Sequence, residues 1–133
     1  MKMIRRAGVR ALFTGMLLFV WVVAQAATPE RPRVWGYGTK TCRDFVAASA
    51  GWDIGQQDQI VEYLRYRDWL SGLVTGLTLA TGIDMLHGAD LEGAMRRIRP
   101  YCEDHPNEDF FTASNFYLKL VGDAEKDSSA DPQ

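Results

Sequence analysis

The chain of 133 residues contains only two cysteines, Cys42 and Cys102, which stand about sixty residues apart. An even cysteine count favours a disulfide in an exported protein, because oxidising compartments let such a bond form and persist. A bond between these two residues would limit the intervening segment to folds in which its two ends meet. Whether the bond forms depends on where the protein resides, which the first residues of the chain indicate.

Residues 1–26 have the three parts of a secretory signal peptide. MKMIRRAGVR carries four basic residues and no acidic one, the uncharged run ALFTGMLLFVWVVA follows, and Ala24-Gln25-Ala26 offers a small-residue cleavage site. The uncharged run is shorter than the ~20 residues that a membrane-spanning helix needs. We therefore expect cleavage before Ala27, a periplasmic location and no membrane contact after cleavage; an uncleaved anchor is the alternative.

Removal of residues 1–26 would leave an acidic protein. The full chain has 15 Lys and Arg and 17 Asp and Glu residues; the leader takes four of the basic residues, so the mature net charge is −6. This charge argues against nucleic acid as a partner, because phosphate binding needs an excess of basic residues. About a hundred residues remain, enough for one small domain with a thin core, which a disulfide would stabilise.

The chain after the leader divides into three parts. Residues 27–38 contain two prolines and two glycines and predict an extended N-terminal arm, whose Trp35 and Tyr37 are candidates for packing on the core. Residues 39–122 show helical periodicity and no strand-like alternation, so we predict a small all-α, single-domain bundle of about four helices. Residues 123–133 are polar, which predicts a disordered tail.

The four predicted helices each have an apolar face at helical spacing and a capping or breaking residue at their ends. The first runs from Thr41 to Gly51, the second over residues 57–80, the third from Asp90 to His105 with Pro100 inside it, and the fourth from its cap Asn107.

The later half of the second helix, WLSGLVTGLTLATG, has no charged residue, which is typical of a helix that is buried on all sides or covered by a partner. Leu70 and Leu77 recur at a spacing of seven, so we expect them in the core. The small residues Ser71, Gly72, Thr75 and Gly76 form a ridge that predicts close approach of another backbone. That backbone belongs either to a helix of the same chain or to a second copy in a homodimer.

The segment CEDHPNED, residues 102–109, carries side chains that can bind a metal or move a proton. Its cysteine is expected in the disulfide, and the other residues lack the separated-pair spacing of zinc ligands, so we predict neither metal nor cofactor. We interpret the segment as a helix–helix corner.

The sequence shows no catalytic motif. Neither histidine, His87 or His105, stands in such a motif, and no phosphate-binding loop is present. We therefore predict that the protein is not an enzyme; a carboxylate pair brought together by folding is the enzymatic alternative.

The stretch TCRDFV, Thr41–Val46, resembles the segment that opens the first helix in periplasmic acid-stress chaperones of the HdeA family. In that family the cysteine of this segment pairs with a second cysteine at the end of a later helix, and Cys42 and Cys102 match these two positions. The similarity extends over about residues 39–121. The resemblance implies an all-α fold and a protein that binds unfolded clients in acid.

We predict that the uncharged half of the second helix forms the surface for a client or partner protein: Trp69, Leu70, Gly72, Leu73, Gly76 and Leu77. If the protein is a chaperone, acid opens the domain and makes these side chains available. The alternative is a periplasmic immunity protein of type VI secretion, which binds and blocks a toxin. Small exported helical proteins with a disulfide include that class as well.

Overall fold

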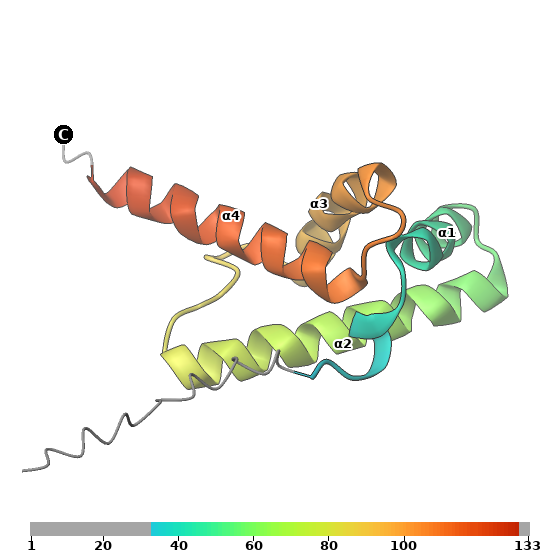
Figure 1. Cartoon of the computed structure of the whole chain (residues 1–133), viewed down its shortest axis with the longest axis horizontal. Coiled ribbons are helices and arrows are strands. Elements are labelled where there is room, and N and C mark those ends of the chain that lie inside the picture. Colours follow the sequence, from blue (N-terminus) through green and yellow to red (C-terminus); the bar gives the residue numbers. More distant parts are fainter. Residues whose placement is uncertain (1–32, 131–133) are drawn as a thin grey trace, which may run out of the picture. The chain divides into compact units, whose positions relative to one another are not determined.

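The structure, a computed structural model, describes residues 33–130; the predicted signal peptide and residues 27–32 of the predicted arm lie outside the described residues, as do residues 131–133. Its elements are the short 3-10 helix η1 (Gly36–Thr39) and the helices α1 (Cys42–Asp53), α2 (Gln57–Thr81), α3 (Leu91–Asp104) and α4 (Phe110–Ala130) (Figure 1). The predicted all-α fold with four helices and one disulfide is confirmed.

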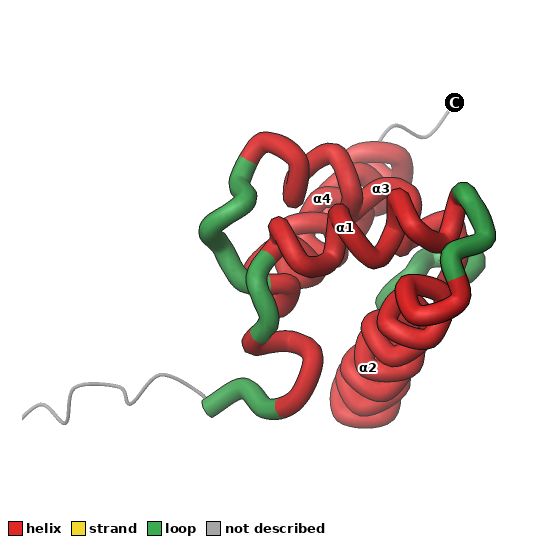
Figure 2. The backbone as a smooth tube through the Cα atoms, turned by 90° about the vertical axis from the view of Figure 1, so that its right-hand side faces the viewer, coloured by secondary structure: helices red, strands yellow, loops and turns green. Residues whose placement is uncertain are grey.

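The helices are arranged around the first half of α2. α1 packs against α2 as a helical hairpin, α3 lies against α1, and α4 lies against α3 (Figure 2). η1 fits between α2 and the start of α4. The later half of α2 diverges from α4, and residues 82–90 span the distance between α2 and α3 (Figure 1). This divergence decides which surfaces of α2 stay open.

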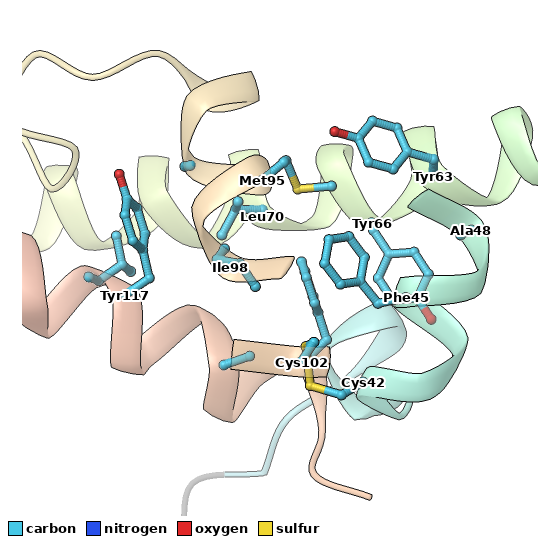
Figure 3. Close-up of a cluster of buried hydrophobic side chains, with 14 of the residues drawn as sticks. Cys42, Phe45, Ala48, Tyr63, Tyr66, Leu70, Met95, Ile98, Cys102 and Tyr117 are labelled. Carbon is cyan, nitrogen blue, oxygen red and sulfur yellow. A yellow bond between two sulfur atoms is a disulfide. The ribbon is translucent and has the colours of Figure 1, made fainter. Parts of the chain in front are cut away.

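The core is aromatic at its centre. Phe110 of α4 lies 4.6 Å from Phe45 of α1 and 4.9 Å from Tyr66 of α2, measured between ring centroids, and all three side chains are buried. Leu70 and Ile98 extend the core along α2 and α3 (Figure 3). Burial of large aromatic side chains supplies much of the hydrophobic stabilisation in a domain of this size.

The segment CEDHPNED forms the predicted helix–helix corner, and it also completes the start of α1. Cys42 and Cys102 form the disulfide, with their Cα atoms 4.7 Å apart. The backbone N–H of Cys42 donates to the carbonyl of Glu108 at 2.7 Å, and that of Arg43 to the carbonyl of Pro106 at 3.1 Å. The first N–H groups of a helix have no partner within the helix, so the corner satisfies two donors that α1 would otherwise leave open.

Two predicted helix boundaries are wrong for identifiable reasons. Gly51 does not end α1, which continues to Asp53; it is buried, and a Cβ there would lie 2.1 Å from the Cβ of Gln59. Its role is close approach between α1 and α2. Asn107 does not cap α4. Asp109 does, because its Oδ1 accepts from the N–H of Thr112 at 2.7 Å.

The predicted disordered tail is also corrected over its described part, because α4 continues through residues 123–130. Every residue of this stretch is exposed, so packing does not hold it. Extending an existing helix fixes one residue for each new hydrogen bond and is far less costly than starting one. Lys126 additionally pairs with Asp123 at 3.4 Å, one turn earlier.

Candidate functional site

The structure separates the six residues that were predicted to bind a client. Leu70 is buried in the core, and Trp69, Leu73 and Leu77 are partly buried against it. Gly72 and Gly76 are exposed, and no atom of the described chain lies within 4 Å of a Cβ built on either glycine. Close packing of this ridge against a helix of the same chain is therefore wrong for residues 33–130, because α4 diverges from α2 at this level.

An uncharged face of α2 is consequently open. Gly72, Thr75, Gly76 and Leu79 follow the spacing i, i+3, i+4, i+7 and so share one side of the helix, which we term the α2 face. Leu79 is 81% exposed. Despite its uncharged half, α2 is not apolar enough to cross a membrane, and the same holds for the other helices of residues 33–130.

A groove of about 440 Å³ adjoins the α2 face, where the N-terminal arm crosses α2. We term it the arm groove; its lining residues are Arg33, Val34, Trp35, Asp68, Trp69, Gly72, Leu73 and Phe111. Three of the six predicted residues meet here, whereas Leu70, Gly76 and Leu77 lie outside the groove. The lining is mostly apolar and aromatic, which is typical of surfaces that take an apolar side chain of a partner.

Trp69 is the fixed centre of the arm groove. Its indole Nε1–H donates to the backbone carbonyl of Trp35 at 2.8 Å, and its ring contacts Phe110 and Phe111 at centroid distances of 5.7 and 6.3 Å. Gly38 lets the arm approach: a Cβ at this position would lie 2.1 Å from Cζ2 of Trp69. The arm is therefore seated on the indole, and Trp35, 71% exposed, projects beside it.

A polar cluster secures the same arm on its other side. The carboxylate of Glu62 accepts from the Tyr37 hydroxyl at 3.1 Å and from Lys40 and Arg65 at 3.4 and 3.0 Å. Burial raises the pKa of Glu62, but the hydrogen bonds from Tyr37 and Lys40, with the charges of Lys40 and Arg65, outweigh burial and lower it below 4.5. The charged form of Glu62 is thus the form that holds the arm.

Val34, Trp35 and Phe111 were not among the predicted site residues. Trp35 and Phe111 are separated by most of the chain, and only the fold brings both to Trp69. The available signal was the aromatic character of the arm, where two prolines and two glycines surround Trp35 and Tyr37. Of these two side chains, Tyr37 packs against the core and Trp35 stays at the surface.

Two matched glycine substitutions test this description of the site. Gly38→Ala should lower the free energy of unfolding by about 1–3 kcal/mol, because the added methyl group overlaps the indole of Trp69. Gly72→Ala should raise it by up to about 1 kcal/mol, because Ala is the better helix former and the space is open. Urea unfolding measures both. A destabilised Gly72→Ala variant would contradict the open ridge.

Three of the candidate ligands of the corner segment, Glu103, His105 and Glu108, are engaged in structural contacts. Glu103 pairs with Arg99 at 2.9 Å, Glu108 accepts from the Tyr101 hydroxyl at 2.7 Å, and Nδ1 of His105 lies 2.9 Å from the carbonyl oxygen of Tyr101. Within residues 33–130, no three His, Cys, Asp or Glu side chains gather in an arrangement that could hold a metal ion. The corner thus stabilises the junction of α1, α3 and α4.

Comparison with known proteins identified no relative of this chain. No protein-family model, no curated protein and no solved structure matches the chain.

Proposed function

We propose that this is an exported, HdeA-like helical protein that binds other proteins and acts as an acid-activated periplasmic chaperone. The observation that carries the proposal is the open, uncharged second half of α2, on which the α2 face and the arm groove adjoin. The arm groove beside this half of α2 is lined mostly by apolar and aromatic side chains, and exposed apolar patches commonly mark sites of protein–protein interaction. The resemblance of TCRDFV to the chaperone family supports the acid trigger.

Charge supplies a physical reason for opening in acid. After signal cleavage the net charge is −6 near neutral pH; when all carboxylates are protonated, the 11 Lys and Arg and two His give +13 before the termini are counted. Asp and Glu ordinarily titrate near pH 4. Repulsion among so many positive charges opposes a compact state.

Two carboxylates, those of Asp84 and Glu62, have lowered pKa values and so add to this loss of stability in acid. The backbone N–H groups of Gly88 and Leu86 donate to Asp84 at 2.8 and 3.0 Å and lower its pKa below the ordinary 3.8. Glu62, with its lowered pKa, behaves alike. A carboxylate whose pKa is lower in the folded state than in the unfolded state stabilises the fold fully when the pH is above its unfolded-state pKa. That stabilisation is lost as the pH falls through its folded-state pKa. Acid should therefore loosen both the turn at Asp84 and the arm.

The disulfide and the core residues determine which apolar side chains the acid-opened domain would expose to a client. Cys42–Cys102 would keep α1 and α3 tied, so that the domain loosens without dispersing. Leu70, Leu73 and Leu77 would then join Trp69 as apolar surface for an unfolding client. The buried and half-buried members of the predicted surface thus serve the opened state, and Gly72 and Gly76 are accessible in both states.

Light scattering tests the proposal. An aggregation-prone periplasmic protein is brought to about pH 2–3, well below the carboxylate pKa values, with and without an equimolar amount of this protein, and is then neutralised. We expect the scattering to be suppressed and the client to be recovered in soluble form. Unchanged scattering would refute chaperone activity.

A matched pair of double variants distinguishes the effect of the predicted client-binding surface on activity from the effect of acid-induced opening of the domain. Leu73→Gln with Leu77→Gln removes two side chains of the predicted surface, and should weaken suppression although it makes opening easier. The control is Ile54→Gln with Val61→Gln, which removes two exposed apolar side chains elsewhere and should suppress aggregation as the unmodified protein does. Equal activity of the two double variants would place client binding outside the later half of α2.

The second candidate is an immunity protein that binds a toxin at neutral pH. The specific observation in its favour is that the arm groove is already open in the folded domain. A toxin gene beside the gene for this protein would favour immunity, whereas a stress operon would favour the chaperone. Biochemically, capture of one partner from periplasmic extract at neutral pH supports immunity, and capture of many proteins in acid supports chaperone activity.

A further inference from the structure

A second apolar groove, of about 480 Å³, lies between α3 and α4 and shares no residue with the arm groove. We term it the α3–α4 groove. Phe116 and Leu120 of α4 line it and are 51% and 57% exposed, more than most large apolar side chains of residues 33–130. Ala124 follows one turn later, so three residues at a spacing of four form an apolar wall about 12 Å long.

One side of this groove is held in place before anything binds. Tyr101 of α3 packs against Phe116 with ring centroids 4.7 Å apart, and the imidazole of His105 stacks on Tyr101 at 4.3 Å. The Tyr101 hydroxyl donates to Glu108 at 2.7 Å. A surface whose side chains are already ordered loses less conformational entropy when a partner docks, and so binds it more tightly.

The rim of the groove is positively charged although the protein is acidic. Arg96 and Arg97 line it and are exposed, and neither has a carboxylate within salt-bridge distance among residues 33–130. The carboxylate nearest in sequence, Glu92 one turn before Arg96, is engaged by Tyr63 at 3.0 Å and by Arg67 at 3.6 Å. Arg96 also borders a neighbouring pocket that contains Asp90 and Glu92. No ion pair within residues 33–130 holds either guanidinium group, so each can take a carboxylate supplied from outside.

We propose that the α3–α4 groove docks an amphipathic helical segment of another protein that carries acidic residues beside its apolar stripe. Apolar anchors of such a helix would lie between α3 and α4 against Phe116 and Leu120, and its carboxylates would meet Arg96 and Arg97. Small-molecule sites enclose most of their ligand, whereas this groove leaves Phe116 and Leu120 half exposed along an open trough. A helix laid along the trough would cover both side chains.

Two fluorescein-labelled peptides of about 15 residues, long enough to sustain a helix, probe the groove by anisotropy at neutral pH. They share one leucine stripe at helical spacing; one carries Glu and the other Lys on both sides of the stripe. We expect the acidic peptide to bind the protein at least about tenfold more tightly, and its affinity to fall as salt is raised.

Variants locate the binding. Arg96→Gln with Arg97→Gln should weaken acidic-peptide binding by about tenfold and leave the melting temperature unchanged, because neither arginine has an ion pair in the described chain. Leu120→Asp should weaken it by about thirtyfold or more, as expected for a central anchor. Ile54→Asp, at an 80% exposed position outside the groove, is the matched control and should bind normally.

Three results would overturn the proposal. The first is that the protein binds both peptides equally tightly or binds neither, and the second is that the double arginine variant binds the acidic peptide as tightly as the unmodified protein. The third is a dimer in sedimentation that Leu120→Asp converts to a monomer. The last result would assign the groove to a second copy of the chain. Because the assay runs at neutral pH and probes α3 and α4, its outcome is independent of the acid-dependent activity proposed for α2.

Discussion

Replacing Cys42 and Cys102 together with Ala should lower the free energy of unfolding by about 4 kcal/mol, because the disulfide closes a loop of about sixty residues and restricts the unfolded chain. Domains of this size are stable by roughly 5–15 kcal/mol, so the loss is a large share of the total. Urea unfolding at neutral pH measures it. The buried position of both cysteines adds a small further cost, since each substitution removes a sulfur atom from the core.

Reduction of the unmodified protein provides the control for the double variant. A thiol reductant should destabilise the unmodified protein by a similar amount and leave the Cys42→Ala, Cys102→Ala variant unaffected. A double variant that unfolds at the same urea concentration as the oxidised protein would show that the cross-link adds nothing to stability. Two free thiols in protein purified without reductant would show that the disulfide does not form.

Phe110→Ala should be the most damaging single substitution, with a loss of about 3–5 kcal/mol. Phe110 is fully buried, and its ring meets Phe45, Tyr66 and Trp69 from two other helices. Truncation would leave a cavity at the point where α1, α2 and α4 converge. The expected result is a cooperative unfolding transition at much lower urea, or a protein that is largely unfolded by circular dichroism.

Phe116→Ala is the matched control on the same helix. Phe116 is half exposed and packs against Tyr101 at the α3–α4 groove. Its truncation to Ala should therefore lower the free energy of unfolding by about 1 kcal/mol, the contribution of one aromatic pair. Equal destabilisation by the two substitutions would mean that Phe110 is not the centre of the core.

The parts of the fold that depend on neighbouring residues were predictable from the sequence. Thr41 caps α1 and Asp90 caps α3 through hydrogen bonds to residues three positions later, and the apolar spacing placed α2 to within one residue at its end. The disulfide was predicted from the even cysteine count together with the predicted signal peptide. Each of these inferences needs only the local pattern or the composition.

The candidate site was harder to predict because it depends on the distance between helices. A ridge of small residues has the same sequence whether a helix packs on it or not, and only the divergence of α4 leaves Gly72 and Gly76 open. Likewise, Trp35 and Phe111 meet at Trp69 through the path of the arm across α2. The same reason explains the wrong prediction that Gly51 ends α1, because the close approach of Gly51 to Gln59 depends on the distance between α1 and α2, which the sequence does not show.

The disulfide also divides the described chain into a closed ring, residues 42–102, and two open branches, of which the first contains η1 and the second contains α4. α1, α2 and α3 as far as Cys102 lie inside the ring, so the ring closure restrains all three helices. α4 is attached at one end alone, beside the ring closure, and packing supplies its remaining hold on the ring. Phe110, Ala113, Tyr117, Leu118 and Val121 pack on the core, and Phe111 and Phe116 pack on Trp69 and Tyr101. We therefore expect the domain to loosen as a hinged branch swinging away from a ring that stays closed.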